Sequence, residues 1–221
     1  MKGIRLAAVL LIAALAALYL SGCNQAQGGG TDVGNPEVTR VTGSLKRVDG
    51  TPAPFIQIQL RPDAFLSNPD SATLLTGHLL QDKTTDTQGF FTFESVPDGD
   101  YRIRAMTSNA MGVVMEFTAD GRTDRMTLAP AYLDTTGSIS GQVVYRGPVR
   151  PASPKILVAV YGMDRWTFTN NAGDFTLSDL PPGTYRLRIS TDVGTVLTAT
   201  VPETRLAAGG RISVGTVDLG P

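Results

Sequence analysis

The chain has 221 residues, 42% of them hydrophobic and 18% charged, and its formal net charge is −1 at pH 7. Because 19 basic residues are balanced by 20 acidic ones, the charge offers no attraction for nucleic acid. A single cysteine and a single histidine exclude a disulfide framework and the usual zinc ligand sets within one chain. We expect no cofactor.

The first 22 residues have the pattern of a secretory signal. Lys2 and Arg5 precede an uncharged, Leu- and Ala-rich run over residues 6–20, and the small residues Ser21 and Gly22 close it. A helix that spans the bilayer needs about 20 apolar residues. The run is shorter, and no basic stop-transfer cluster follows it, so we expect a cleaved signal peptide over residues 1–22.

The sequence Leu20-Ser21-Gly22-Cys23 resembles the lipobox of bacterial lipoproteins, in which the thiol receives a diacylglyceryl group and the signal is cut before the cysteine. The resemblance implies that Cys23 is lipidated and anchors the mature protein to a membrane, because two or three acyl chains hold stably. Asn24 follows in place of the aspartate that favours inner-membrane retention in those families. This implies the bacterial outer membrane, with the periplasmic or surface face left open. A plain secretory signal with a free thiol is the alternative.

Residues 23–37 form the predicted anchor and linker. This stretch contains a triple glycine and no apolar period, which indicates a flexible tether. Its r.m.s. reach is on the order of 20 Å.

The rest of the chain contains an internal repeat. Residues 89–104 align without a gap on residues 173–188, and the openings 41–45 and 139–143 also match. The openings are 98 residues apart and the later segments 84, so the first repeat carries 14 extra residues. These lie around Asp63 to His78, where Asn68-Pro69-Asp70-Ser71 suits the start of a short helix.

Within each repeat the apolar residues recur with period two, which predicts strands with one core face and one solvent face. The predicted core positions alternate with polar or small ones: Ile56, Ile58 and Leu60 with Gln57, Gln59 and Arg61; Val158 and Val160 with Ala159 and Tyr161; Tyr185, Leu187 and Ile189 with Arg186, Arg188 and Ser190. Turns are predicted at Asp49-Gly50, Asp120-Gly121, Gly209-Gly210, Pro97-Asp98-Gly99 and Pro181-Pro182-Gly183, with positive φ at glycine. Many short strands separated by turns favour β-sandwiches.

The repeated unit resembles the carboxypeptidase regulatory-like domain, a transthyretin-like or prealbumin-like sandwich. The residues that match the recurring motif of this family are, in the first repeat, Gly43, Gly89, Phe91, Phe93, Val96, Pro97, Gly99 and Tyr101. In the second repeat they are Gly141, Gly173, Phe175, Leu177, Leu180, Pro181, Gly183 and Tyr185. The resemblance implies an all-β protein with two tandem, seven-stranded, largely antiparallel sandwiches: a first repeat over residues 38–132 and a second over residues 136–221, joined by a short connector over residues 129–136. The repeated Phe, Leu and Tyr side chains are expected in the cores.

Residues that could support catalysis are scarce. His78 is the only histidine, and no Gly-x-Ser-x-Gly surrounds any serine, so we expect no catalytic residue. Asp86, Asp98 and Asp100 could supply oxygens to a calcium ion. They could equally serve as ordinary turn residues, and we expect no metal site.

The candidates for ligand binding are aromatic and cationic. Trp166, the only tryptophan, lies beside Arg165 and close to Tyr161, and these three residues could stack on and hold a sugar ring. Alternatively, Trp166 and Phe168 alternate inward on one strand and pack the second core. Four arginines, Arg102, Arg104, Arg186 and Arg188, are predicted on the outward face of equivalent strands. They would meet an anionic polysaccharide or lipid, or simply form a solvated face.

We therefore expect a non-catalytic lipoprotein of the bacterial cell envelope that displays two β-sandwich binding or structural modules. The alternative is a carbohydrate-binding lipoprotein. The expected partners are the membrane, through the lipid anchor, and a polysaccharide or another envelope protein.

Overall fold

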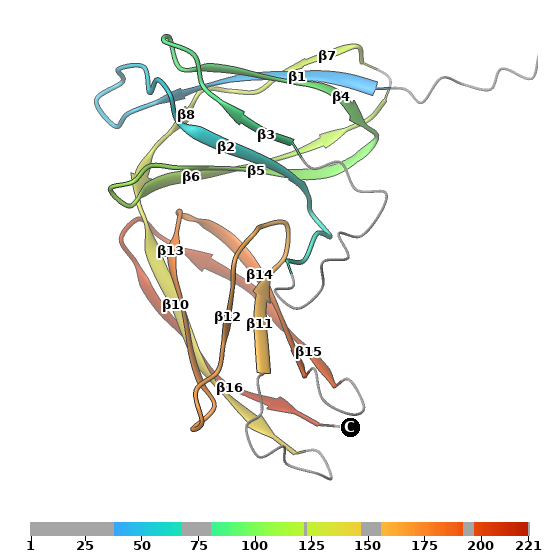
Figure 1. Cartoon of the computed structure of the whole chain (residues 1–221), viewed down its shortest axis with the longest axis vertical. Coiled ribbons are helices and arrows are strands. Elements are labelled where there is room, and N and C mark those ends of the chain that lie inside the picture. Colours follow the sequence, from blue (N-terminus) through green and yellow to red (C-terminus); the bar gives the residue numbers. More distant parts are fainter. Residues whose placement is uncertain (1–37, 68–80, 122, 147–155, 192–196, 221) are drawn as a thin grey trace, which may run out of the picture. The chain divides into compact units, whose positions relative to one another are not determined.

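The computed structural model describes residues 38–67, 81–121, 123–146, 156–191 and 197–220 (Figure 1). The predicted signal peptide, Cys23 and the tether lie outside these residues, as do His78 and the predicted helix start at Asn68. The described residues all belong to one compact unit.

The described chain is built from strands, and none of its described residues is helical, which confirms the predicted all-β class. The strands of the first repeat are β1 (Val38–Lys46), β2 (Gln57–Pro62), β3 (Gln81–Thr84), β4 (Phe90–Pro97), β5 (Gly99–Met106), β6 (Met111–Ala119) and β7 (Arg125–Thr127). Two short strands follow, β8 (Ala131–Tyr132) and β9 (Asp134–Thr135). Those of the second repeat are β10 (Gly137–Tyr145), β11 (Ile156–Val160), β12 (Trp166–Phe168), β13 (Asp174–Leu180), β14 (Gly183–Thr191), β15 (Thr198–Leu206) and β16 (Arg211–Leu219).

The two repeats have the same sheet topology. One sheet of the first repeat has the order β4-β1-β7 and the other β3-β2-β5-β6. In the second repeat the corresponding orders are β13-β10-β16 and β12-β11-β14-β15. Most pairs are antiparallel, as predicted, but β7 and β16 pair in parallel with β1 and β10. The opening strand of each repeat therefore lies beside its closing strand.

The buried side chains form one hydrophobic cluster in each repeat, and the predicted core residues belong to them. The first cluster contains Phe91, Phe93, Val96, Tyr101 and Ile103, and the second contains Phe175, Leu177, Leu180, Tyr185 and Leu187. The Tyr185 hydroxyl donates a hydrogen bond to the Pro181 carbonyl oxygen, which satisfies the polar end of a buried ring. The aromatic residues of the repeated motif therefore pack the core in both repeats.

The strand with the aromatic residues is preceded or opened in each repeat by a glycine, which is required because a neighbouring backbone carbonyl lies too close to admit a side chain. Gly89 and Gly173 have φ of 78° and 87°. A Cβ at Gly89 would lie 2.5 Å from the Leu45 carbonyl oxygen, and one at Gly173 would lie 2.2 Å from that of Val143. Only glycine combines this backbone conformation with this contact.

A β-bulge follows the aromatic residues in both repeats. The pairing register shifts between Thr39 and Val41 and between Gly137 and Ile139. On the facing strands Ser95 and Asp179, which occupy equivalent positions, have φ of 55° and 54°, in the left-handed region used by bulges. The predicted positive φ occurs at Gly99 but not at Gly183, so the Pro181-Pro182-Gly183 turn was predicted wrongly in this detail.

The connector between the repeats is more structured than predicted. Its strand β8 pairs in parallel with the end of β1, and its strand β9 pairs antiparallel with the start of β6. Leu133, between these strands, is buried in the first cluster. The connector is therefore anchored on the first repeat by hydrogen bonds and packing. The exact boundaries of the two predicted domains stay a prediction.

Candidate functional site

In the first repeat, the arginines predicted to form a solvated stripe are instead largely enclosed, while Arg186 and Arg188 of the second repeat are partly exposed. Only 4% of Arg102 is exposed, and Arg104 is partly buried next to residues of the second repeat. Arg61, placed on the solvent face by its alternation, is only 6% exposed. The alternation located the outer face of the sheet correctly, but this face packs against the second repeat.

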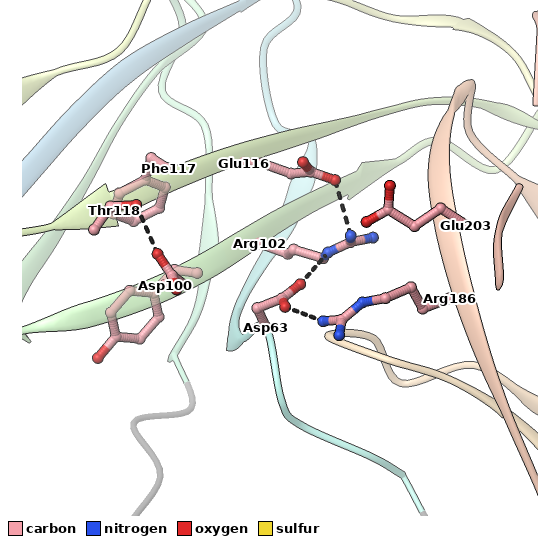
Figure 2. A pocket seen from close by; sticks show the side chains of 9 residues that line it. Asp63, Asp100, Arg102, Glu116, Phe117, Thr118, Arg186 and Glu203 are labelled. Atoms are coloured by element: carbon pink, nitrogen blue, oxygen red, sulfur yellow. Dashed lines mark hydrogen bonds and ion pairs between the residues drawn. The ribbon is translucent and has the colours of Figure 1, made fainter. Parts of the chain in front are cut away.

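Arg102 on β5 is the centre of a charged cluster that involves both repeats (Figure 2). Its Nε donates to Asp63 Oδ1 at 2.7 Å, and its Nη2 lies 3.0 Å from Glu116 Oε1. Its Nη1 donates to the backbone carbonyl of Thr184 in the second repeat at 2.9 Å. From the same repeat, Arg186 pairs with the other oxygen of Asp63. A buried guanidinium is tolerated only when its donors are satisfied in this way.

Arg61 at the end of β2 forms a second link between the repeats. Its Nε donates to Asp164 Oδ2 in the second repeat at 2.8 Å, and its Nη1 donates to Asp82 Oδ1 at 2.8 Å. The guanidinium carbon also lies 5.7 Å from the centroid of the Phe65 ring. The planar, multiply donating head of arginine suits this shared, partly buried position better than lysine would.

Backbone and apolar contacts reinforce these ion pairs. The Gly162 amide donates to the Phe65 carbonyl at 2.7 Å, and Leu66 forms a parallel bridge with Met163. Gly162, with φ of 72°, leaves room for Arg102, because a Cβ there would lie 2.5 Å from Arg102 Cδ. The start of the extra segment of the first repeat therefore packs directly on the second repeat.

A cleft lies at this charged cluster. It has a volume of about 390 Å³ and is lined by Asp63, Asp100, Tyr101, Arg102, Glu116, Phe117, Thr118, Arg186 and Glu203. Arg186 and Glu203 enter it from the second repeat (Figure 2). The rings of Tyr101 and Phe117 stack with centroids 5.6 Å apart. Because its two arginines are paired with its own acids, the cleft is primarily a polar joint between the repeats.

The acids considered for calcium act within turns and strands. Asp86 Oδ1 accepts hydrogen bonds from the amides of Gln88 and Phe90, and Asp100 Oδ1 accepts one from the Thr118 hydroxyl at 2.6 Å. Within the described ranges, no group of three or more Asp, Glu, His or Cys side chains has an arrangement that could hold a metal ion. Asp86 therefore serves a turn, and Asp100 joins two neighbouring strands.

Burial alters the titration of two groups near the joint. Burial raises the pKa of Tyr185 well above its ordinary value, since the tyrosinate form would be poorly solvated. Burial is also the main cause that lowers the pKa of Arg104, and the charge of Arg165 is the second. Arg104 Nε has no hydrogen-bond partner among the described residues. The second repeat therefore covers the middle of the first repeat's outer sheet face.

The three residues predicted to bind ligand do not converge on one site. Tyr161 lies under Arg186, whose guanidinium carbon is 5.0 Å from its ring centroid. Arg165 is held by the Ser178 carbonyl and by Asp179, whose Oδ2 is 2.7 Å away. Trp166 is 39% exposed and contacts Phe168 edge to face, with centroids 5.5 Å apart. Trp166 is thus the most exposed of the three, and Tyr161 and Arg165 are partly buried. The predicted site stays a prediction.

The alternative prediction, that Trp166 packs inward in the second core, is wrong. Trp166 pairs with Ala159, while the core residue Val158 pairs with Thr167. Trp166 and Phe168 therefore share the outer face of their sheet. Ala159, predicted to face solvent, is buried at this position, next to its partner Trp166.

The acids that complete the joint were missed by sequence reasoning. Asp63 was read only as the start of the extra segment, and no contact with the first repeat was predicted for Asp164. Asp63 lies two residues after Arg61, at the end of an arginine-bearing strand, but the strand before Asp164 contains no arginine. No local pattern indicated that they would meet across the repeats.

Comparisons with known proteins support no family assignment. No family model matches the sequence. No curated protein matches it. Membership of the carboxypeptidase regulatory-like family therefore stays a prediction. In the described part of the chain there is also no helix with the length and apolar character needed to cross a bilayer.

Several solved bacterial structures are similar at low identity. A minor pilin of Streptococcus agalactiae is 17% identical over 82% of this chain and 95% of its own, with a TM-score of 0.34. The shaft pilin of Lactobacillus rhamnosus GG is 11% identical over 83% and 98%, with a TM-score of 0.32. A putative carbohydrate binding protein from Pseudomonas aeruginosa is 17% identical over 42% and 88%, with a TM-score of 0.28. Similarities of this degree assign no function.

Proposed function

We propose that the chain is a lipid-anchored, non-catalytic protein of the bacterial cell envelope. In this proposal it acts as a structural module made of two firmly joined sandwiches. The observation that carries this proposal is the ion-pair joint. Arg102 and Arg61 are almost fully buried, and each contacts both repeats. Groups enclosed and paired in this way maintain a geometry and are not free to react.

The chemistry of the cleft supports the non-catalytic reading. A general acid or base has to reach substrate with an unengaged proton site, and a nucleophile needs a base within hydrogen-bond reach. Asp63 is bonded by two arginines, and Glu116 by one. Asp100 accepts a hydrogen bond from Thr118. The cleft groups that could carry protons are therefore largely committed to the fold.

The joint gives the two repeats a defined relation. Ion pairs between partly buried groups are less screened by salt than exposed pairs, and backbone hydrogen bonds from Gly162 and to Thr184 add direction. A protein that presents a surface at a fixed distance from its anchor needs such a connection. A flexible linker between the modules would not provide it.

The membrane anchor is tested by replacing its predicted attachment point. Full-length protein and Cys23→Ala are produced in a bacterial host and separated into soluble and membrane fractions, followed by a high-salt wash. We expect the parent chain in the outer-membrane fraction and the variant released, because a diacylglyceryl group and a further acyl chain provide the affinity. Intact mass should show the acyl groups on the parent chain alone. A variant that stays with the membrane after the wash contradicts the anchor.

The alternative function, polysaccharide binding, has one specific observation in its favour. Trp166 is exposed, its cross-strand partner is Ala159, and its ring contacts Phe168 edge to face. A rigidly held aromatic ring on an open sheet face is the usual stacking surface for a sugar ring. This function is compatible with the anchor and the joint, because it uses residues of the second repeat that do not take part in the joint.

A further inference from the structure

Equivalent sheet faces of the two repeats have different surroundings. In the first repeat, Gln59, Arg104 and Val114 are partners in register across β2, β5 and β6. This row is covered: Val114 packs against the second hydrophobic cluster, and burial lowers the pKa of Arg104. The equivalent row of the second repeat is Ala159, Arg188 and Thr200.

The row of the second repeat is extended by an aromatic ring and is exposed at its two ends, while Ala159 within it is buried. Trp166 pairs with Ala159, so Trp166, Ala159, Arg188 and Thr200 lie side by side across the four strands β12, β11, β14 and β15. Trp166 and Thr200 are exposed and Arg188 is partly exposed. Four neighbouring strands place the row's ends roughly 14 Å apart. The row therefore combines a ring, a small residue, a cation and a hydroxyl on one flat face.

A second copy of the module does not fit this face in the way that the second repeat fits the first. Pro181 approaches the first repeat closely at Gly112, where a Cβ would lie 2.9 Å from Pro181 Cγ. Thr198 occupies the position equivalent to Gly112, two residues before Thr200 on an exposed strand. Its side chain fills the space that the docked proline needs. The face is thus not a repeat of the internal joint.

The charges of the surrounding residues favour an anion. Nearby arginines already have carboxylate partners: Arg186 pairs with Asp63 and Arg165 with Asp179. Asp164 is engaged by Arg61. Arg188 makes no hydrogen bond or ion pair with any side chain in the part of the chain that the structure describes. Its planar guanidinium is suited to a carboxylate, which it can bind through two parallel hydrogen bonds.

We propose that the row Trp166, Ala159, Arg188 and Thr200 binds an acidic polysaccharide, with a sugar ring stacked on Trp166 and a uronic acid carboxylate paired with Arg188. An extended chain that lies across the strands can reach both side chains. Ala159 is buried, so it acts as the small residue that separates the ring from the cation and not as a contact for the sugar. Thr200 supplies a hydroxyl for hydrogen bonding beyond Arg188. This inference deepens the carbohydrate-binding alternative and does not depend on the lipid anchor.

The test compares an acidic oligosaccharide with its neutral counterpart. Full-length protein in detergent micelles is titrated with galacturonic acid hexamer and with galactose hexamer, and binding is followed by fluorescence of Trp166, the only tryptophan, and by calorimetry. We expect saturable binding of the acidic hexamer, weaker at high ionic strength. The neutral hexamer should bind at least fivefold more weakly, because it offers Arg188 no carboxylate.

Three variants separate the contributions of the row. Trp166→Ala should weaken binding of the acidic hexamer at least tenfold in calorimetry. Arg188→Gln should reduce the acidic hexamer to the affinity of the neutral one, and Ala159→Leu should block both. Phe55→Ala is the matched control, because Phe55 is a 70% exposed aromatic residue of the first repeat. The affinity of this variant for the acidic hexamer should equal that of the parent protein.

Several results would overturn the proposal. These are equal affinity for the two hexamers, binding that survives Trp166→Ala, or no binding of either hexamer. Displacement of the acidic hexamer by vesicles that contain phosphatidylglycerol would assign the face to anionic lipid instead. Because Cys23→Ala is not involved, none of these outcomes bears on the anchor.

Discussion

Replacing Asp63 by asparagine tests whether the charged joint contributes to stability. Asp63 accepts a hydrogen bond from Arg102 Nε at 2.7 Å and pairs with Arg186 through its other oxygen. Asparagine keeps the size and one acceptor oxygen, but it loses the charge and directs an NH2 group at the second guanidinium. Hydrogen bonds to charged groups contribute about 1.5–3 kcal/mol each. Arg102 retains Glu116 and the Thr184 carbonyl, so we expect a loss of about 2 kcal/mol.

The matched control is Asp218→Asn, which weakens an ion pair of similar geometry on the surface. Arg146 Nε lies 2.9 Å from Asp218 Oδ1, and the two side chains are 65% and 60% exposed. Pairs of this kind contribute less than about 1 kcal/mol. In the joint, the Arg102 side chain is 5% exposed and that of Asp63 29%. The comparison therefore sets a partly buried carboxylate shared by two arginines against an exposed carboxylate paired with one.

Urea unfolding, followed by circular dichroism with the slope m fitted for each variant, measures both losses. The reasoning predicts that Asp63→Asn lowers the free energy of unfolding by at least 1 kcal/mol more than Asp218→Asn. Raising the salt concentration should reduce the effect of Asp218→Asn and leave that of Asp63→Asn mostly intact. Losses within about 0.5 kcal/mol of each other would refute the view that the joint is an energetically coupled element.

Two further predictions concern close packing in the second repeat, with a surface turn of the first repeat as a control. Gly173→Ala should destabilise the protein by about 3 kcal/mol, because positive φ costs about 1–2 kcal/mol and the new Cβ would also collide with the Val143 carbonyl. The control is Gly50→Ala, where φ is 83° and the surrounding space is open, and it should cost about 1 kcal/mol. Equal losses of the two variants in urea unfolding would contradict the close contact at Gly173. Tyr185→Phe should cost about 1 kcal/mol at pH 8 through its hydrogen bond to Pro181. Burial raises the pKa of Tyr185 in the folded protein, so the stability contributed by its neutral form is present below about pH 10 and is lost progressively above it. The parent should therefore lose more stability than Tyr185→Phe between about pH 9 and pH 11. Parallel losses of the two proteins would show that Tyr185 is not the group responsible.

The strands and both cores were predictable because their signals are local. The phrase from Gly89 to Tyr101 combines a tight turn, alternating aromatic residues and a second turn within one short segment, and its copy repeats every element. Such consistency between turn chemistry and hydrophobic period specifies a structure strongly. The parallel pairing of β1 with β7 was not predictable in this way, because it joins residues about 85 positions apart.

The joint was misread for a physical reason. Period-two alternation tells which residues share a face, but it does not say what covers the face opposite the core. Arg61 and Arg102 were assigned to solvent because the rule for an isolated antiparallel sheet places charged residues there. The same limit concealed the location of Trp166, whose outward direction follows from its pairing with Ala159 and not from its own segment.

The parallel closing strands determine how each repeat responds to tension. In the first repeat the chain enters at Val38 and runs along β1, and β8, through which it leaves, lies parallel to the far end of that strand. In the second repeat the entering strand β10 is likewise parallel to the final strand β16. A force that pulls the two ends of either repeat apart therefore acts along neighbouring strands in opposite directions. Their hydrogen bonds are loaded together in shear instead of being peeled open one by one, which is the arrangement that resists mechanical extension best.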